Sequence, residues 1–233
     1  MSRITIYFFT IFVSLSTYVS AYSLQNEQLV TIHGFLGTPW NMHYTSLALE
    51  KEKMSVKHWK YPSTEKNIVE HAHDLVIYLQ KLAFQNPGKP IHFLTHSMGG
   101  LILRAALSCP SCPYEAHIGK AVLLAPPNQG AVWGRYLGEF YLSNLFSGGK
   151  SGYELMTEFD FEHLGQFPDT KDVLVVAGNF SLNPLIDGDN DGTVAVAETY
   201  LSTPHKHVIL NVGHKTILFS TNVSKLVKSF FSQ

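Results

Sequence analysis

Residues 91–100 read IHFLTHSMGG, an apolar run that leads directly into a serine surrounded by small residues. A strand followed by x-Ser-x-Gly and a helix is the pattern of a nucleophile elbow, a tight turn that holds the serine hydroxyl clear of the sheet edge. Ser97 is therefore the candidate nucleophile. Met98 would offer a backbone N–H at the start of the following helix, where an oxyanion can be held.

The composition is that of one globular domain. The chain has 233 residues, of which 45% are hydrophobic, and a net charge of −1. This length is enough to bury a sizeable core. Because basic residues are not in excess, we do not expect nucleic acid as a partner.

The N-terminal segment differs from the rest of the chain. Arg3 gives it a positive start, residues 4–13 are mostly apolar, and Val19-Ser20-Ala21 provides small residues for a cleavage site. This pattern predicts a secretory signal peptide over residues 1–21, which leaves a domain of residues 22–233 in a secreted or periplasmic location. An uncleaved membrane anchor is the alternative, but Ser and Thr interrupt the short apolar stretch, which favours cleavage.

Strand-like and helix-like segments alternate along the remaining chain. This alternation predicts an α/β fold with a six-stranded, mainly parallel sheet and helices on both faces. The active site of such a sheet lies at the carboxyl ends of its strands. We expect strands at residues 28–33, 55–60, 91–94, 120–125, 172–178 and 207–212, and helices at 41–53, from Ser63 or Thr64 to Asn86, at 101–107 and at 216–231.

Residues 130–168 interrupt this alternation. They are rich in aromatic side chains and follow a strand, so they would lie beside the strand ends. We expect a short insertion that serves as a lid or as an acyl-binding wall. A pair of helices that packs its own small core is an alternative that is compatible with either role.

A serine nucleophile needs a base and a group that orients the base. His214 follows the last expected strand, where a loop can deliver an imidazole to Ser97, and is the candidate general base. The acid must come from the segment that holds Asp187, Asp189 and Asp191. We choose Asp191 because a tight turn after it leads back into the sheet, with Asp189 as the second choice.

The same acidic segment also fits a calcium loop. Its residues match the pattern D-x-D-x-D-G-x5-E of an EF-hand. Because prolines lie close on both sides, the flanking helices of an EF-hand are not expected, although a calcium site of another kind that supports the acid loop stays open. The matching residues are Asp187, Asp189, Asp191, Gly192 and Glu198.

The loop after the first expected strand reads His33-Gly34-Phe35. Glycine lets the backbone turn close to the site, so the N–H of Phe35 would point inward as the second oxyanion donor.

The other histidines receive no catalytic role. We expect His96 to point away from the site, because neighbouring residues on a strand alternate faces. We place the following histidines on helix or loop surfaces: His43, His58, His71, His73 and His117.

The two cysteines, Cys109 and Cys112, lie three residues apart. In an exported protein this spacing favours a local disulfide over free thiols, and free thiols over redox chemistry. Zinc would need more ligands than this pair offers.

Four motifs that follow one another along the chain carry a family resemblance. The chain resembles the α/β-hydrolase superfamily and, within it, small bacterial lipases and esterases of the triacylglycerol lipase type without a large cap domain. The resemblance covers nearly all of residues 28–231. One departure is Thr95, which replaces a glycine and crowds the elbow. The motifs are HGF at 33–35, HSMGG at 96–100, APPNQG at 125–130, and NDGTV at 190–194 with VGH at 212–214.

The resemblance implies a triad of Ser97, Asp191 and His214, with the N–H groups of Phe35 and Met98 as the oxyanion hole. We expect an exported serine hydrolase that cleaves carboxylic esters through an acyl-enzyme, without cofactor or metal. Its partner would be a small acyl ester or lipid, with contact to a lipid surface, and the chain would be a monomer. An acyltransferase or thioesterase, and a non-catalytic binding protein of the same fold, are the alternatives.

Overall fold

The computed structural model describes residues 24–130, 149–158, 160–181 and 183–233. The expected signal peptide and much of the expected insertion, residues 131–148 and 159, lie outside the described residues. In the part of the chain that is described, no helix combines the length and the apolar character needed to cross a membrane.

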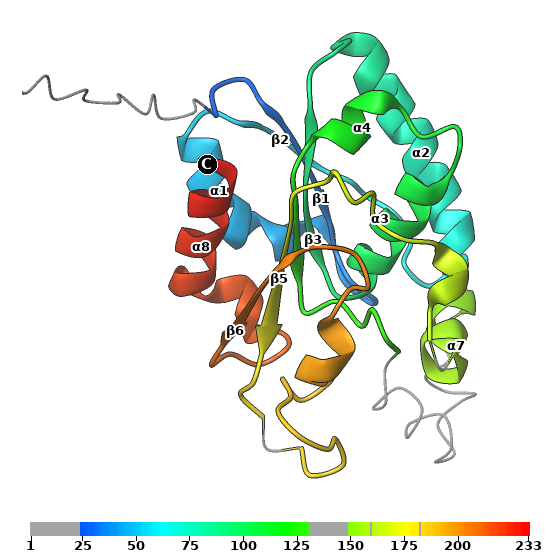
Figure 1. Ribbon diagram of the computed structural model, residues 1–233, viewed down its shortest axis with the longest axis vertical. Helices are drawn as coiled ribbons and strands as arrows, with labels where there is room; N and C mark the ends of the chain where they lie inside the picture. The colour runs from blue at the N-terminus through cyan, green and yellow to red at the C-terminus, as the bar shows by residue number, and fades with distance from the viewer. Residues whose placement is uncertain (1–23, 131–148, 159, 182) are drawn as a thin grey trace, which may run out of the picture.

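A six-stranded sheet forms the centre of the molecule (Figure 1). Its strands follow the order β2-β1-β3-β4-β5-β6, and every neighbouring pair is parallel, which confirms the predicted fold class. The carboxyl ends of all six strands therefore lie at the same edge of the sheet. The strands are β1 (Gln28–Ile32), β2 (Ser55–His58), β3 (Ile91–His96), β4 (Ala121–Leu124), β5 (Val173–Gly178) and β6 (Lys206–Leu210).

Helices cover both faces of the sheet, as predicted. Figure 1 shows α1 (His43–Lys51) and α8 (Thr221–Phe231) on one side, and α2 (Ile68–Gln85) and α3 (Met98–Ser108) on the other. The second side also carries α4 (Tyr114–Ile118) and α7 (Lys150–Thr157). The described residues also form four short 3-10 helices: η1 (Pro39–Met42), η2 (Glu162–Leu164), η3 (Val196–Thr199) and η4 (Thr216–Phe219).

The four inner strands, β1, β3, β4 and β5, are buried along their whole length because helices cover both of their faces, whereas the edge strands β2 and β6 are partly exposed. Alternate residues of one strand enter two different clusters: Val30 packs toward α2 and α3, whereas Leu29 packs toward α1 and α8. The same division holds for Phe93 and Leu94 of the central strand β3. This two-sided burial fixes the sheet and, with it, the positions of the loops at its edge.

Four elements differ from the expectations. The helix expected from Ser63 or Thr64 begins at Ile68, because the side chain of Asn67 caps it by accepting from the N–H of Glu70. The helix after β3 begins at Met98, directly after the turn, rather than at residue 101. The expected helix over residues 216–231 is divided, because Ser220 is extended and caps a new helix, its hydroxyl accepting a hydrogen bond from the N–H of Val223. The short helix α4 lacks a strong apolar period and was not expected.

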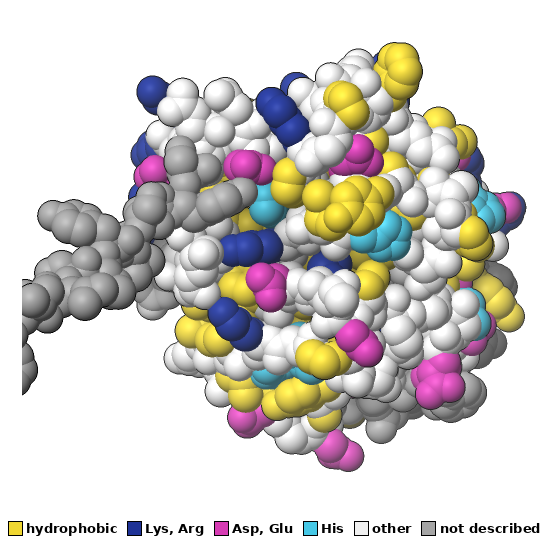
Figure 2. Space-filling model, turned by 45° about the horizontal axis from the view of Figure 1, so that its top comes forward, with side chains coloured by type: hydrophobic (Ala, Val, Ile, Leu, Met, Phe, Trp, Pro, Cys, Tyr) yellow, Lys and Arg dark blue, Asp and Glu magenta, His cyan; other side chains and the backbone are white. Residues whose placement is uncertain are grey.

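Charges of both signs share the surface. Figure 2 shows Lys and Arg side chains interspersed with Asp and Glu side chains on one face, which agrees with the net charge of −1.

Candidate active site

Ser97 occupies the turn between β3 and α3. Its backbone has φ +51° and ψ −127°, a conformation that costs free energy for a residue with a side chain and that is typical of a nucleophile elbow. The helix start also packs tightly on β1, since a Cβ added at Gly99 would lie 2.5 Å from the carbonyl oxygen of Ile32. Thr95 stays within β3, fully buried, so the turn forms without glycine at this position.

His214 connects the serine to the acid. Its Nε2 lies 3.1 Å from the hydroxyl oxygen of Ser97, and its Nδ1 lies 2.8 Å from a carboxylate oxygen of Asp191. Because the carboxylate can only accept, Nδ1 carries the proton in the neutral ring and Nε2 is free to accept from the serine. The arrangement can remove a proton from the Ser97 hydroxyl.

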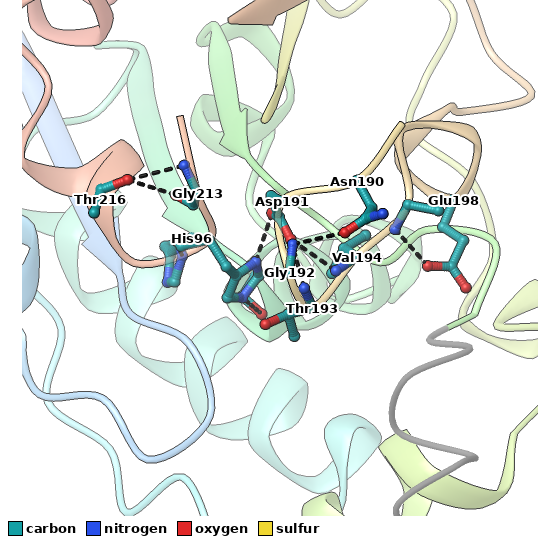
Figure 3. Close-up of polar contacts among 12 residues, drawn as sticks. His96, Asn190, Asp191, Gly192, Thr193, Val194, Glu198, Gly213 and Thr216 are labelled. Atoms are coloured by element: carbon teal, nitrogen blue, oxygen red, sulfur yellow. Dashed lines mark hydrogen bonds and ion pairs between the residues drawn. The ribbon is translucent and has the colours of Figure 1, made fainter. Parts of the chain in front are cut away.

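Hydrogen bonds from its own loop hold the carboxylate of Asp191 (Figure 3). Its second oxygen accepts from the N–H groups of Thr193, at 2.9 Å, and Val194, at 2.7 Å. The N–H of His214 also donates to the Asp191 carbonyl at 2.8 Å. The backbone thus fixes both the carboxylate and the start of the histidine loop.

The other acidic residues of this segment are arranged differently. Asp187 and Asp189 are exposed. Glu198 accepts from the N–H of Ala195, at the start of η3, and Figure 3 shows its side chain apart from that of Asp191. In the described part of the chain these carboxylates form no group of three whose oxygens lie within 4.8 Å of one another, so the geometry does not form the calcium loop that the sequence pattern left open.

The loop after β1 approaches the nucleophile closely. A Cβ added at Gly34 would lie 2.9 Å from the Cβ of Ser97, so only glycine fits there. Neither the N–H of Phe35 nor that of Met98 donates a hydrogen bond to the described residues. Both are therefore open donors beside the serine, as expected for an oxyanion hole.

Residues after β2 hold this loop in place. The hydroxyl of Tyr61 donates to the carbonyl oxygen of His33 at 2.6 Å, and the N–H of Leu36 donates to the hydroxyl of Ser63 at 3.0 Å. The Nδ1–H of His33 donates to the Gly34 carbonyl oxygen at 2.9 Å. No pattern in the sequence predicted these supports, although Tyr61 follows a strand that neighbours β1.

The prediction that His96 points away from the site is wrong. Its Nε2–H donates to the carbonyl oxygen of His214 at 2.9 Å, and the two rings lie 4.8 Å apart. The alternation of faces applies to regular extended backbone, and the positive φ of Ser97 ends it at this residue. Burial lowers the pKa of His96 to about 3, so the ring is neutral and acts as a donor.

The surface assignments of the other histidines are partly wrong. His73 is exposed, and His43, His58 and His117 are half-buried. His71 is fully buried, edge-on against the ring of Tyr61, because it lies on the face of α2 that packs on the sheet.

The expected disulfide is not formed. Cys112 is buried against the core, whereas the thiol of Cys109 contacts the hydroxyl of Ser111 at 3.2 Å, and both cysteines are free. Burial raises the pKa of the Cys112 thiol to about 12. A thiol with so little thiolate is a poor reagent for redox chemistry.

A cavity of about 500 Å³ opens beside Ser97. Apolar side chains from two places form much of its wall: Leu155 and Met156 on α7, and Leu218 and Phe219 after β6. The described end of the expected insertion therefore contributes a wall to the cavity. The cavity suits an apolar group of several carbon atoms.

Comparisons with known proteins concern part of the sequence and the fold. Residues 25–128 match the family described as "Putative serine esterase (DUF676)". No curated protein matches the chain.

Solved structures share the fold at low identity. Lipase BlEst2 of Bacillus licheniformis in mature form is 16% identical with a TM-score of 0.67, over 89% of this chain and 93% of its own. Esterase PF2001 of Pyrococcus furiosus is 20% identical with a TM-score of 0.62, over 88% and 81%. The metagenomic carboxyl esterase MGS0156 is 17% identical with a TM-score of 0.63, over 91% and 72%. The chain has the fold of these α/β-hydrolases.

Proposed function

We propose that this chain is a serine hydrolase that cleaves carboxylic esters with apolar acyl groups. The observation that carries the proposal is the hydrogen-bonded series from the Ser97 hydroxyl through His214 to Asp191, beside an apolar cavity. The match of residues 25–128 to a serine esterase family and the shared fold with lipases and esterases support it.

In this proposal the reaction has two halves. The oxygen of Ser97 attacks the acyl carbonyl carbon while His214 takes its proton, and the same proton then passes to the leaving alcohol. Water, deprotonated by His214, attacks the acyl-enzyme and releases the acid and the free serine. Asp191 keeps the imidazole in the required tautomer and stabilises its charge, and the N–H groups of Phe35 and Met98 stabilise the oxyanion of each tetrahedral intermediate.

The cavity wall is the basis for the substrate class. Apolar side chains of α7 and of the segment after β6 would contact the acyl chain. The transfer of this chain out of water lowers the free energy of the complex. Export is part of the proposal and is supported only by the sequence of residues 1–21. N-terminal sequencing of the chain recovered outside the cytoplasm would test cleavage after Ala21.

The direct experiment combines labelling with turnover. A fluorophosphonate should form an adduct on Ser97 in the native chain and none in S97A, and S97A should lose hydrolysis of p-nitrophenyl esters of every chain length. Full turnover by S97A would refute the mechanism. A native chain that neither reacts with the label nor turns over any ester would be a binding protein of this fold.

A further inference from the structure

Three potential metal ligands meet between α1 and β2, at a place that the proposed ester hydrolysis does not use. His43 begins α1, Glu50 lies two turns later on the same helix, and His58 is the last residue of β2. Their ligand atoms all lie within 4.8 Å of one another. In the described part of the chain, no other group of three or more histidine, cysteine or carboxylate side chains brings its ligand atoms this close together.

The distances from the Glu50 carboxylate to the two imidazoles suit a metal ion held between them better than direct hydrogen bonds. A single oxygen of Glu50 lies 3.8 Å from Nδ1 of His43 and 3.7 Å from Nε2 of His58. Both separations are too long for hydrogen bonds. Ligands bound to zinc at about 2.0–2.2 Å in tetrahedral geometry are about 3.4 Å apart. Each imidazole would need to approach the carboxylate oxygen by a few tenths of an ångström, and the two imidazole nitrogens, which lie within 4.8 Å of each other, would need to approach by up to about 1.4 Å.

A residue of the neighbouring strand orients His58. Thr31 is paired with His58 in the parallel register of β1 and β2, and its hydroxyl oxygen lies 2.8 Å from Nδ1 of His58. When Nδ1–H donates to this buried hydroxyl, Nε2 keeps its lone pair on the side of Glu50. A second hydrogen bond of this kind is typical of histidines that bind metal ions.

The other two ligands are also placed for binding. The hydroxyl of Ser46 donates to the same Glu50 oxygen at 3.3 Å, which holds the carboxylate along the helix. All three ligand side chains are partly exposed, with fractions of 39% for His43, 32% for Glu50 and 26% for His58, so an ion has a path from solvent.

We propose that His43, Glu50 and His58 bind one Zn²⁺ ion, with water in the fourth position. Two imidazoles and one carboxylate are a donor set that zinc favours, whereas Ca²⁺ and Mg²⁺ require more oxygen ligands. The ion would join the first helix of the domain to the edge strand β2. This site departs from our expectation of a chain without metal and does not depend on the proposed ester hydrolysis.

Calorimetric titration of zinc chloride tests the site. The chain is purified without a polyhistidine tag, treated with a chelator and dialysed. We expect one ion per chain in the native protein and in S97A, which separates the metal site from the proposed nucleophile. H58A and E50Q should each weaken zinc binding at least about tenfold. Zinc should also raise the melting temperature of the native chain and of S97A, because the ion binds the folded state only.

The controls address unspecific binding and misfolding. H73A removes an exposed imidazole from α2 and should bind zinc as the native chain does. E50Q keeps the size of the side chain, so its circular dichroism spectrum and its melting temperature without zinc should match the native values. Binding that persists in both H58A and E50Q, binding that is lost in H214A instead, or no binding to the native chain would each overturn the proposal.

Discussion

Asp189 and Asp191 are two residues apart but have opposite surroundings. Asp189 is exposed, whereas the carboxylate of Asp191 is buried and accepts from His214 and from two backbone N–H groups. We predict that D191N lowers kcat for a p-nitrophenyl ester by about 10³- to 10⁴-fold, because an amide favours the wrong tautomer of the imidazole.

D189N is the matched control for this substitution, because it makes the same chemical change in the same loop. Its kcat should stay within about twofold of the native value, as for surface changes without a buried partner. If D189N lost as much activity as D191N, the assignment of the acid would be wrong.

His96 offers a second prediction for a single residue. H96A removes the donor to the carbonyl oxygen of His214, so the histidine loop loses one of its supports, and we expect kcat to fall about tenfold with KM unchanged. H96Q can place an amide N–H at the position of Nε2 and should recover most of the loss.

The pH profile distinguishes positioning by His96 from proton transfer by it. Because its pKa is held at about 3, His96 stays neutral over the working range, and the ratio of native to H96A rates should be the same at pH 6 and pH 9. A ratio that changes with pH, or an H96Q variant as slow as H96A, would contradict the positioning role.

The segment between β2 and α2 holds the loop after β1, which carries Phe35, through hydrogen bonds from Tyr61 and to Ser63. Y61F removes the hydroxyl that donates to the His33 carbonyl oxygen and leaves a buried acceptor unpaired. We predict a free energy of unfolding lower by about 1–2 kcal/mol and a kcat lower by about tenfold, since the loop that carries the Phe35 N–H would be less well fixed. Kinetics and urea unfolding measure both effects.

Y78F provides the comparison for Y61F. The hydroxyl of Tyr78, on α2, makes no hydrogen bond to the described residues, so its removal should change neither quantity appreciably. Equal kinetic effects of the two substitutions would mean that Tyr61 does not act through the loop.

Helix α7 gives a prediction about substrate size. M156W adds volume to the wall of the cavity, so we expect kcat/KM for p-nitrophenyl esters of long acyl chains to fall at least tenfold, with short chains affected less than about threefold. T157W changes an exposed neighbour on the same helix and should alter neither class. An unchanged chain-length profile in M156W would remove α7 from the acyl site.

At the scale of elements, what could be predicted depended on local signals. Apolar segments and the turn residues that bound them predicted the strands, and the tight pattern around Ser97 predicted the elbow, since both features need only neighbours in sequence. The supports of the site come from contacts across the sheet, such as that of Tyr61, and short-range patterns do not show them. His96 was misplaced because a single positive φ overrides strand alternation.

The whole molecule brings distant residues together through one simple property, an all-parallel sheet. The loops after β1, β3, β5 and β6 meet at one edge, and they carry Phe35, Ser97, Asp191 and His214. The order of these loops in the chain was therefore enough to predict that the side chains of Ser97, Asp191 and His214 meet. Several imidazoles end up inside the domain, with pKa values lowered by burial: His33, His71, His92 and His96.

These buried imidazoles predict sensitivity to acid. The folded chain keeps His92 neutral, with its Nδ1 accepting from the N–H of Lys120, and burial lowers its pKa more than the Glu27 carboxylate 3.4 Å away raises it. In the unfolded chain the ring binds a proton near pH 6.5. Below that value the unfolded state binds more protons than the folded state. The contribution of His92 to the free energy of unfolding is therefore complete above pH 6.5 and is lost as the pH is lowered.

Substitution of His92 measures its share of this acid sensitivity. H92N keeps an acceptor for the Lys120 N–H but cannot titrate, so the slope of the free energy of unfolding between pH 6 and pH 5 should decrease by up to about 1.4 kcal/mol per pH unit. Urea unfolding at closely spaced pH values gives the slope. H73N removes an exposed imidazole and should leave it unchanged, whereas a native slope in H92N would show that His92 is protonated to the same extent in both states.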